Sequence, residues 1–205
     1  MEATSAAVIL LFVFAMFSGM KGDIPKDASA RYSPALTQTV DISSVPAGFF
    51  AGGGQEARES IDRYVRPRAK KISVEESADV VDAIMRYSEQ YDVNPKLITA
   101  MIWRESGFDP QSVSSSNAQG LAQLLPSTAA HIGIRDPFSI DEGTKGAVLY
   151  LKMMLDKWIG YPNQVALALA SYAEGPNQVA RAGGAYSDKP AKYINDIMSA
   201  CNSIN

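Results

Sequence analysis

The sequence predicts an all-α domain over residues 73–205, and three observations support this fold class. Apolar residues recur in this part at intervals of three and four, which is the period of an amphipathic helix. Residues that favour helix starts precede these stretches. No stretch alternates convincingly between apolar and polar residues as a half-buried strand does.

The first two helices of this domain have clear N-terminal signals. Ser73 and Glu76 have the spacing of a capping box, and an apolar stripe follows them. Asn94 and Pro95 combine an N-cap residue with a proline at the first helical position. The second helix is therefore expected to run from Pro95 to about Gly107.

Five further helices are expected after a loop rich in serine, asparagine and glycine. The segment over residues 164–172 is nearly all apolar, which predicts that its helix is buried in the centre of the domain. In chain order, the five expected helices cover residues 126–133, 141–158, 164–172, 176–181 and 191–203.

The segment over residues 1–20 is expected to be a signal or an uncleaved membrane anchor. Residues 3–20 carry no charge, and their length is near the lower limit for a membrane-spanning helix. A cleaved secretory signal and a core helix are the alternatives, although the N-terminus holds Glu2 and no basic residue. Lys21 and Lys26 lie on the domain side, opposite to the usual bias for export across a bacterial inner membrane. A membrane of different origin is therefore an alternative to the bacterial inner membrane.

Residues 21–72 are expected to form a flexible linker. They contain scattered prolines, serines and threonines and a run of glycines over 52–54, without a sustained apolar period. One or two helical turns fit residues 56–64. Four basic residues close the segment, either as a solvated boundary or as a patch attracted to anionic lipid or wall polymer: Arg66, Arg68, Lys70 and Lys71.

The composition restricts the chemistry that the chain can perform. A single histidine and a single cysteine exclude a Cys/His zinc site and a disulfide framework. A formal net charge of -3 argues against nucleic-acid binding driven by counterion release. We therefore expect no metal, no cofactor and no nucleic-acid partner. Any catalytic group must be a carboxyl, amide, hydroxyl or phenol.

Glu105 is the candidate catalytic group that helical periodicity identifies. It continues, one turn on, the apolar stripe of Ile98, Met101 and Ile102. Burial and the negative end of the helix dipole both disfavour a carboxylate, so the pKa of Glu105 is expected to rise. A carboxyl that stays protonated near neutral pH suits general acid catalysis. The alternative is a side chain that turns to solvent or pairs with Arg104.

Three short motifs occur in order in the helical part, over residues 105–110 (ESGFDP), 120–126 (GLAQLLP) and 171–176 (SYAEGP). Together they resemble the motifs of the soluble lytic transglycosylase (SLT) domain, a goose-lysozyme-like helical fold that acts on bacterial peptidoglycan. The resemblance implies that Glu105 is the catalytic acid and base, with Ser106 hydrogen-bonded near it. It further implies that Gln123 and Tyr172 line the sugar cleft and that Tyr193 closes this cleft.

Two positions depart from the family pattern. Ala122 stands where methionine is usual, and Ala173 stands where the third motif usually has asparagine. These departures suggest one alternative, a catalytically inactive peptidoglycan-binding scaffold.

The implied reaction is cleavage of the β-1,4 bond between N-acetylmuramic acid and N-acetylglucosamine, with formation of 1,6-anhydro-N-acetylmuramic acid. It needs one carboxyl, whereas hydrolysis usually uses two. The nearest second acid, Asp109, is expected to cap the loop. A goose-type muramidase that uses water is the other alternative. The expected partners are peptidoglycan glycan strands and a membrane that residues 3–20 enter. The resemblance also implies local opening of the wall, together with the proteins of a secretion or conjugation machine or of a phage virion. The internal membrane of such a virion is then the alternative to the bacterial envelope.

Overall fold

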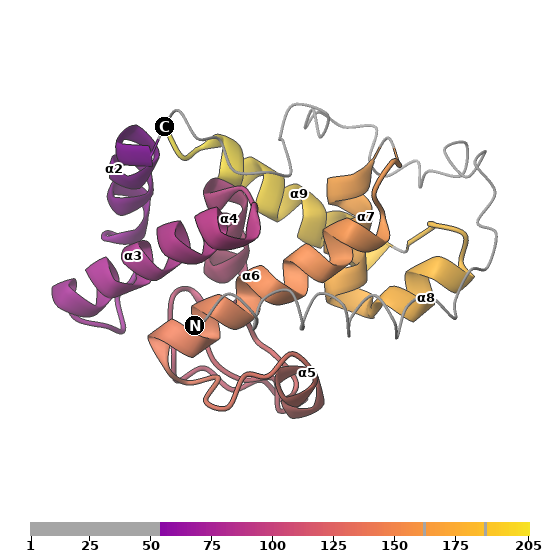
Figure 1. The fold of residues 1–205 in the computed structure, drawn as a ribbon, viewed down its shortest axis with the longest axis horizontal. Coiled ribbons are helices and arrows are strands. Elements are labelled where there is room, and N and C mark those ends of the chain that lie inside the picture. The colour runs from indigo at the N-terminus through magenta and orange to yellow at the C-terminus, as the bar shows by residue number, and fades with distance from the viewer. Residues whose placement is uncertain (1–53, 162, 187) are drawn as a thin grey trace, which may run out of the picture.

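The structure, a computed structural model, describes residues 54–161, 163–186 and 188–205. These residues form helices, with a long loop over residues 107–125 between α4 and α5, and within the described residues β pairing is confined to two isolated bridges of that loop. The all-α fold class is therefore confirmed. The helices are α2 (Gly54–Val65), α3 (Val74–Tyr91), α4 (Pro95–Ser106), α5 (Pro126–His131), α6 (Ile140–Lys157), α7 (Gln164–Glu174), α8 (Pro176–Arg181) and α9 (Asp188–Asn202) (Figure 1).

The expected helix starts of α3 and α4 are confirmed by their hydrogen bonds. The Ser73 hydroxyl accepts from the Glu76 amide at 3.1 Å, and the Glu76 carboxylate accepts from the Ser73 amide at 2.8 Å. Asn94 caps α4 by accepting from the first free amides of that helix. Gly107 then ends α4 in the left-handed conformation, with φ of 62°.

Helix α9 begins three residues earlier than the expected range. It starts at Asp188, so Pro190 lies in its first turn. Proline is tolerated there because the first amides of a helix have no partner within the helix.

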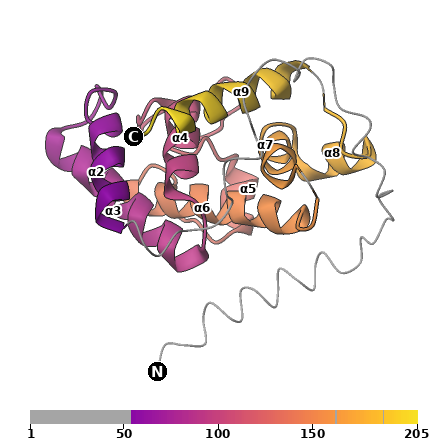
Figure 2. The ribbon, with the colours of Figure 1, turned by 90° about the horizontal axis from the view of Figure 1, so that it is seen from above.

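Helix α7 is the buried centre of the described fold, as its composition predicted. Every residue from Val165 to Ser171 is buried. Helix α6 lies against α3 and α7, while α9 crosses both α4 and α7 (Figures 1 and 2). The indole nitrogen of Trp158, at the end of α6, donates to the Ser171 hydroxyl at 2.8 Å, and the Trp158 side chain is fully buried. This tryptophan is thus part of the core.

The flexible linker expected over residues 21–72 is wrong for residues 54–72, which belong to the folded domain. Helix α2 buries Ile61, Tyr64 and Val65, which recur at the spacing of one helix face, and it contacts α3 and α4. Lys71 then pairs with Asp109 at 2.7 Å. So short a helix has little stability alone, and packing supplies it. Polar and basic neighbours hide the short apolar stripe in the sequence.

The membrane expectation rests on residues outside the described part of the chain. The apolar segment over residues 3–20 and the linker up to residue 53 are among the residues that are not described. Among the described helices, none combines the length and the apolar character needed to cross a bilayer.

Candidate active site

Helices α4 and α9 bring Glu105 and Tyr193 together. Glu105 lies in the last turn of α4, and the Tyr193 hydroxyl on α9 donates to its Oε1 atom at 2.5 Å. Tyr193 is buried, with 8% of its surface exposed, and Glu105 is partly buried. Two side chains that are 88 positions apart in sequence therefore form one hydrogen-bonded pair.

The pKa of Glu105 is raised above its ordinary value, as the sequence predicted. Burial is the main cause, while the hydrogen bond from Tyr193 and the positive charge of Arg104 oppose it. The Arg104 side chain pairs instead with Asp196, at 3.1 Å. The alternative in which Glu105 is neutralised by an ion pair with Arg104 is thus not observed.

Tyr172 links α7 to the second motif. Its hydroxyl donates to the carbonyl oxygen of Ala122 at 2.7 Å. Burial, and after it the negative charge of Glu105, raises the pKa of Tyr172 well above its ordinary value. The same two causes act on Tyr193. Both phenols therefore stay protonated and serve as neutral hydrogen-bond donors beside the Glu105 carboxyl.

Gln123 is fixed within the loop between α4 and α5. Its backbone has a positive φ of 47°, and its amide nitrogen donates to the carbonyls of Ser112 at 3.1 Å and Gly120 at 2.9 Å. Gly120 has φ of +72°, and a Cβ atom there would lie 1.8 Å from the carbonyl oxygen of Pro137. The loop is thus held tightly against the segment that leads into α6.

Ser106 and Asp109 both form hydrogen bonds with nearby backbone groups. The Ser106 hydroxyl donates to the carbonyl of Ile102 at 3.2 Å, one turn back in α4, which differs from the bond expected near Glu105. Asp109 accepts from the amide of Gln111 at 2.9 Å and pairs with Lys71. The prediction that Asp109 caps the loop is therefore confirmed.

The sequence analysis missed Tyr150 of α6. Its ring centroid lies 4.9 Å from that of Tyr172, and burial raises its pKa. A signal was present: Tyr150 is three residues after Ala147 and four before Met154, on the apolar stripe of the helix. A tyrosine on such a stripe indicates a buried ring with a polar group to satisfy.

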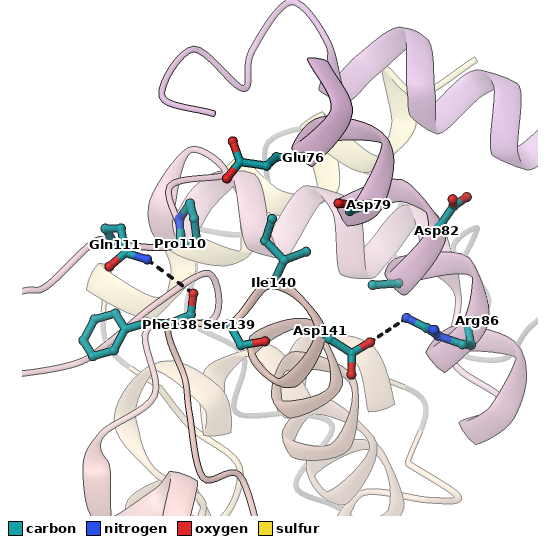
Figure 3. A pocket seen from close by; sticks show the side chains of 11 residues that line it. Glu76, Asp79, Asp82, Arg86, Pro110, Gln111, Phe138, Ser139, Ile140 and Asp141 are labelled. Carbon is teal, nitrogen blue, oxygen red and sulfur yellow. Dashed lines mark hydrogen bonds and ion pairs between the residues drawn. The ribbon is translucent and has the colours of Figure 1, made fainter. Parts of the chain in front are cut away.

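A hollow of about 580 Å³ lies between α3 and the start of α6, and Glu105 is not among the residues that line it. Figure 3 shows Asp79, Asp82 and Asp141 around it, with Arg86 paired to Asp141 at 2.6 Å. Asp141 also accepts from Tyr87, whose pKa burial and this bond raise to about 12. In the described ranges, no group of three or more histidine, cysteine, aspartate or glutamate side chains is placed to hold a metal ion.

Comparisons with known proteins found relatives that are named transglycosylases. A transglycosylase of Enterobacteria phage PRD1 is 31% identical over 88 residues, which are 43% of this chain and 32% of that protein. Membrane-bound lytic murein transglycosylase F of Klebsiella pneumoniae is 29% identical over 117 residues, 55% of this chain and 22% of the relative. Its counterpart in Sodalis glossinidius is 32% identical over 88 residues, 42% of this chain and 19% of the relative. The chain thus spans a third or less of the length of these relatives.

The family model of the transglycosylase SLT domain matches residues 82–195, more than half of the chain. This range contains the three motifs. It also contains Glu105 and Tyr193, the two residues of the hydrogen-bonded pair. The chain belongs to the transglycosylase SLT domain family.

Proposed function

We propose that the chain is a peptidoglycan lytic transglycosylase in which Glu105 is the catalytic acid and base. The observation that carries this proposal is the partly buried Glu105 carboxyl, with its raised pKa and its hydrogen bond from Tyr193. Such a carboxyl keeps its proton toward neutral pH and can deliver it to a leaving oxygen. Membership of the SLT domain family supports the substrate class.

In the first step, Glu105 donates its proton to the oxygen that joins N-acetylmuramic acid to N-acetylglucosamine. The bond from this oxygen to C1 of the muramyl sugar breaks, and the N-acetylglucosamine side leaves with a hydroxyl group. The acetamido carbonyl of the substrate stabilises the positive charge that develops at C1. Tyr193 then holds the newly formed Glu105 carboxylate through its hydroxyl, which stabilises the charge left on the enzyme.

In the second step, the same carboxylate acts as a base. It takes the proton of the muramyl C6 hydroxyl, whose oxygen bonds to C1 and closes the 1,6-anhydro ring. Glu105 returns to its protonated state and no water is consumed. The local engagement of Asp109 with Lys71 and Gln111 supports a mechanism with one carboxyl, because hydrolysis usually uses two.

The remaining family positions are proposed to bind the glycan. Gln123 would present its amide to the sugar from a rigid loop, since its nitrogen is tied to Ser112 and Gly120. Tyr172 would form the cleft wall opposite, with its ring held by its bond to Ala122. For Ser106, the bond to the carbonyl of Ile102 favours a role within the last turn of α4, next to Glu105.

Mass spectrometry of the fragments released from purified peptidoglycan tests the chemistry. Transglycosylase products are lighter than hydrolysis products by the mass of one water molecule. Glu105→Gln is expected to abolish release. Asp109→Asn, which makes the same change at the other nearby acid, is expected to retain it, provided that circular dichroism shows both variants folded. Exclusively hydrated products, or equal loss in both variants, would indicate a two-carboxyl muramidase. An inactive parent chain would indicate a scaffold.

We also propose that this cleavage opens the wall locally, either for passage of a phage genome or for a secretion or conjugation machine. The similarity to a phage transglycosylase and to membrane-bound enzymes supports both settings. The apolar segment over residues 3–20 would hold the enzyme at a membrane. Mass spectrometry of the intact protein from its native source tests the anchor, which requires that this segment be retained, whereas a start near Lys21 would indicate secretion.

A further inference from the structure

A groove of about 730 Å³ lies between α2, α4 and α9, beside the candidate active site. Its apolar side is formed by Tyr64 and Trp103, whose rings meet edge to face at 6.3 Å between centroids. Trp103 is only partly buried, so part of its indole is available to a ligand. This combination of exposed aromatic surface and an open groove is typical of a binding site for an extended ligand.

The charge of the groove favours an anionic occupant. Arg68, Arg104 and Lys192 line it, against one carboxylate, that of Asp196. Arg104 and Lys192 both pair with Asp196, at 3.1 Å and 2.8 Å, so one acid is shared between two cations. The groove therefore keeps an excess of positive charge that a carboxylate-bearing ligand can neutralise.

Arg68 is already held in place for such a ligand. Its guanidinium carbon lies 3.8 Å from the centroid of the Tyr64 ring, and its Nη1 atom donates to the Tyr64 carbonyl at 3.0 Å. A guanidinium that is stacked in this way loses less conformational freedom when it binds a carboxylate. A guanidinium has five N–H donors, so Arg68 can form a charge-assisted pair in addition to its bond to Tyr64.

The groove adjoins the proposed reaction centre on two helices. Arg104 precedes Glu105 on α4, and Lys192 precedes Tyr193 on α9. Neighbouring residues of a helix point about 100° apart, so the groove opens on the faces next to those that hold the Glu105–Tyr193 pair. In the proposed reaction, the muramyl sugar lies at Glu105, and this sugar carries the wall peptide on its lactyl group.

We infer that this groove binds the acidic peptide attached to the muramyl sugar at the scissile bond. The inference rests on the proposed function, because that function places the muramyl unit at Glu105. The peptide carboxylates would pair with Arg68 and Lys192, and its alanine methyl groups would pack on Trp103. The enzyme would then cut peptide-bearing strands in preference to strands from which the peptides have been removed. The acidic hollow of Figure 3 would repel the same peptide.

The ratio of kcat/KM for two substrates tests this preference. The substrates are glycan strands with intact peptides and the same strands stripped by an amidase, both measured at low ionic strength. The parent chain is expected to prefer the intact strands by between about threefold and about tenfold, the size expected from two exposed charge pairs. The Arg68→Gln/Lys192→Gln double variant is expected to lose this preference. Arg86→Gln, which removes a cation from the acidic hollow, is the matched control and should keep it.

An equal preference in the double variant and the parent, or no preference in the parent, would overturn the inference. Binding of the soluble tetrapeptide L-Ala-γ-D-Glu-diaminopimelate-D-Ala separates the inference from the proposed function. This peptide is expected to change the fluorescence of Trp103 in the parent and not in the double variant, whether or not the chain cuts glycan. No change in the parent would overturn the groove assignment, and so would binding of phosphatidylglycerol vesicles in place of the peptide. A parent chain that binds the tetrapeptide but does not cut glycan would count against the proposed function and not against the groove assignment.

Discussion

Replacing Tyr193 with phenylalanine is expected to move the pH dependence of cleavage toward alkaline pH. The Tyr193 hydroxyl donates to Glu105 and so opposes the burial that raises the pKa of that carboxyl. Without this donor the burial remains, and the pKa of Glu105 rises further. Because the proposed acid must be protonated to act, the alkaline limb of the rate profile should move with it.

The size of this displacement follows from the strength of the lost hydrogen bond. A hydrogen bond to a charged group contributes about 1.5–3 kcal/mol. If the hydrogen bond stabilises the carboxylate by about 1.4 kcal/mol more than the protonated carboxyl, its loss raises the pKa of Glu105 by about one unit. The protonated carboxyl can also accept a bond from the hydroxyl, which cancels part of the effect, so we expect a displacement of about one unit. Phenylalanine keeps the buried ring, so the packing of α9 on α4 should be preserved.

The assay is the initial rate of fragment release from peptidoglycan between about pH 4 and about pH 9. Tyr161→Phe is the control, since its ring packs edge to face on Trp158, at the end of α6. Its profile should match that of the parent. A Tyr193→Phe limb that stays in place, or moves to lower pH, would refute the role of this hydroxyl in setting the protonation of Glu105.

Three further predictions concern stability. Gly120→Ala should lower the free energy of unfolding by more than about 1 kcal/mol, because it adds a contact with the Pro137 carbonyl to the strain of a positive φ. Ser171→Ala should cost about 1–3 kcal/mol, since it leaves the buried indole nitrogen of Trp158 without its acceptor. At pH values above the pKa of Glu105 in the folded protein, Glu105→Gln should have a higher melting temperature than the parent. The pKa of Glu105 is higher in the folded state than in the unfolded state, so the protonated acid stabilises the fold fully at pH values below the unfolded-state pKa. This stabilisation is lost as the pH rises through the folded-state pKa.

Denaturant melts and thermal melts at several pH values check these predictions. Gly133→Ala is a matched control for the glycine, because its φ of +76° is similar but its Cβ would meet nothing within 4 Å. Equal costs at Gly120 and Gly133 would remove the contact with Pro137 from the explanation. An unchanged unfolding midpoint in Ser171→Ala, or a gain in Glu105→Gln that is equally large in acid, would contradict the other two.

Local signals were sufficient to predict most helices. The capping box of Ser73 and the Asn94-Pro95 start act within a few residues of the helix that they begin, so they are visible without the fold. The same is true of the buried α7, whose apolar composition leaves no exposed face. Helical turns were expected over residues 56–64, but α2 was assigned to the linker because its stability comes from packing against α3 and α4, which the local sequence does not show.

For the candidate site, the order of residues along α4 was enough to predict that Glu105 continues an apolar helix face and that its pKa should rise. This follows from helical periodicity, a property of neighbouring residues. The folded arrangement was needed to show that Tyr193 donates to Glu105, that Asp109 pairs with Lys71, and that Ser106 donates to its own helix. Each of these depends on where a side chain points or which helices cross, and neither is encoded in local spacing.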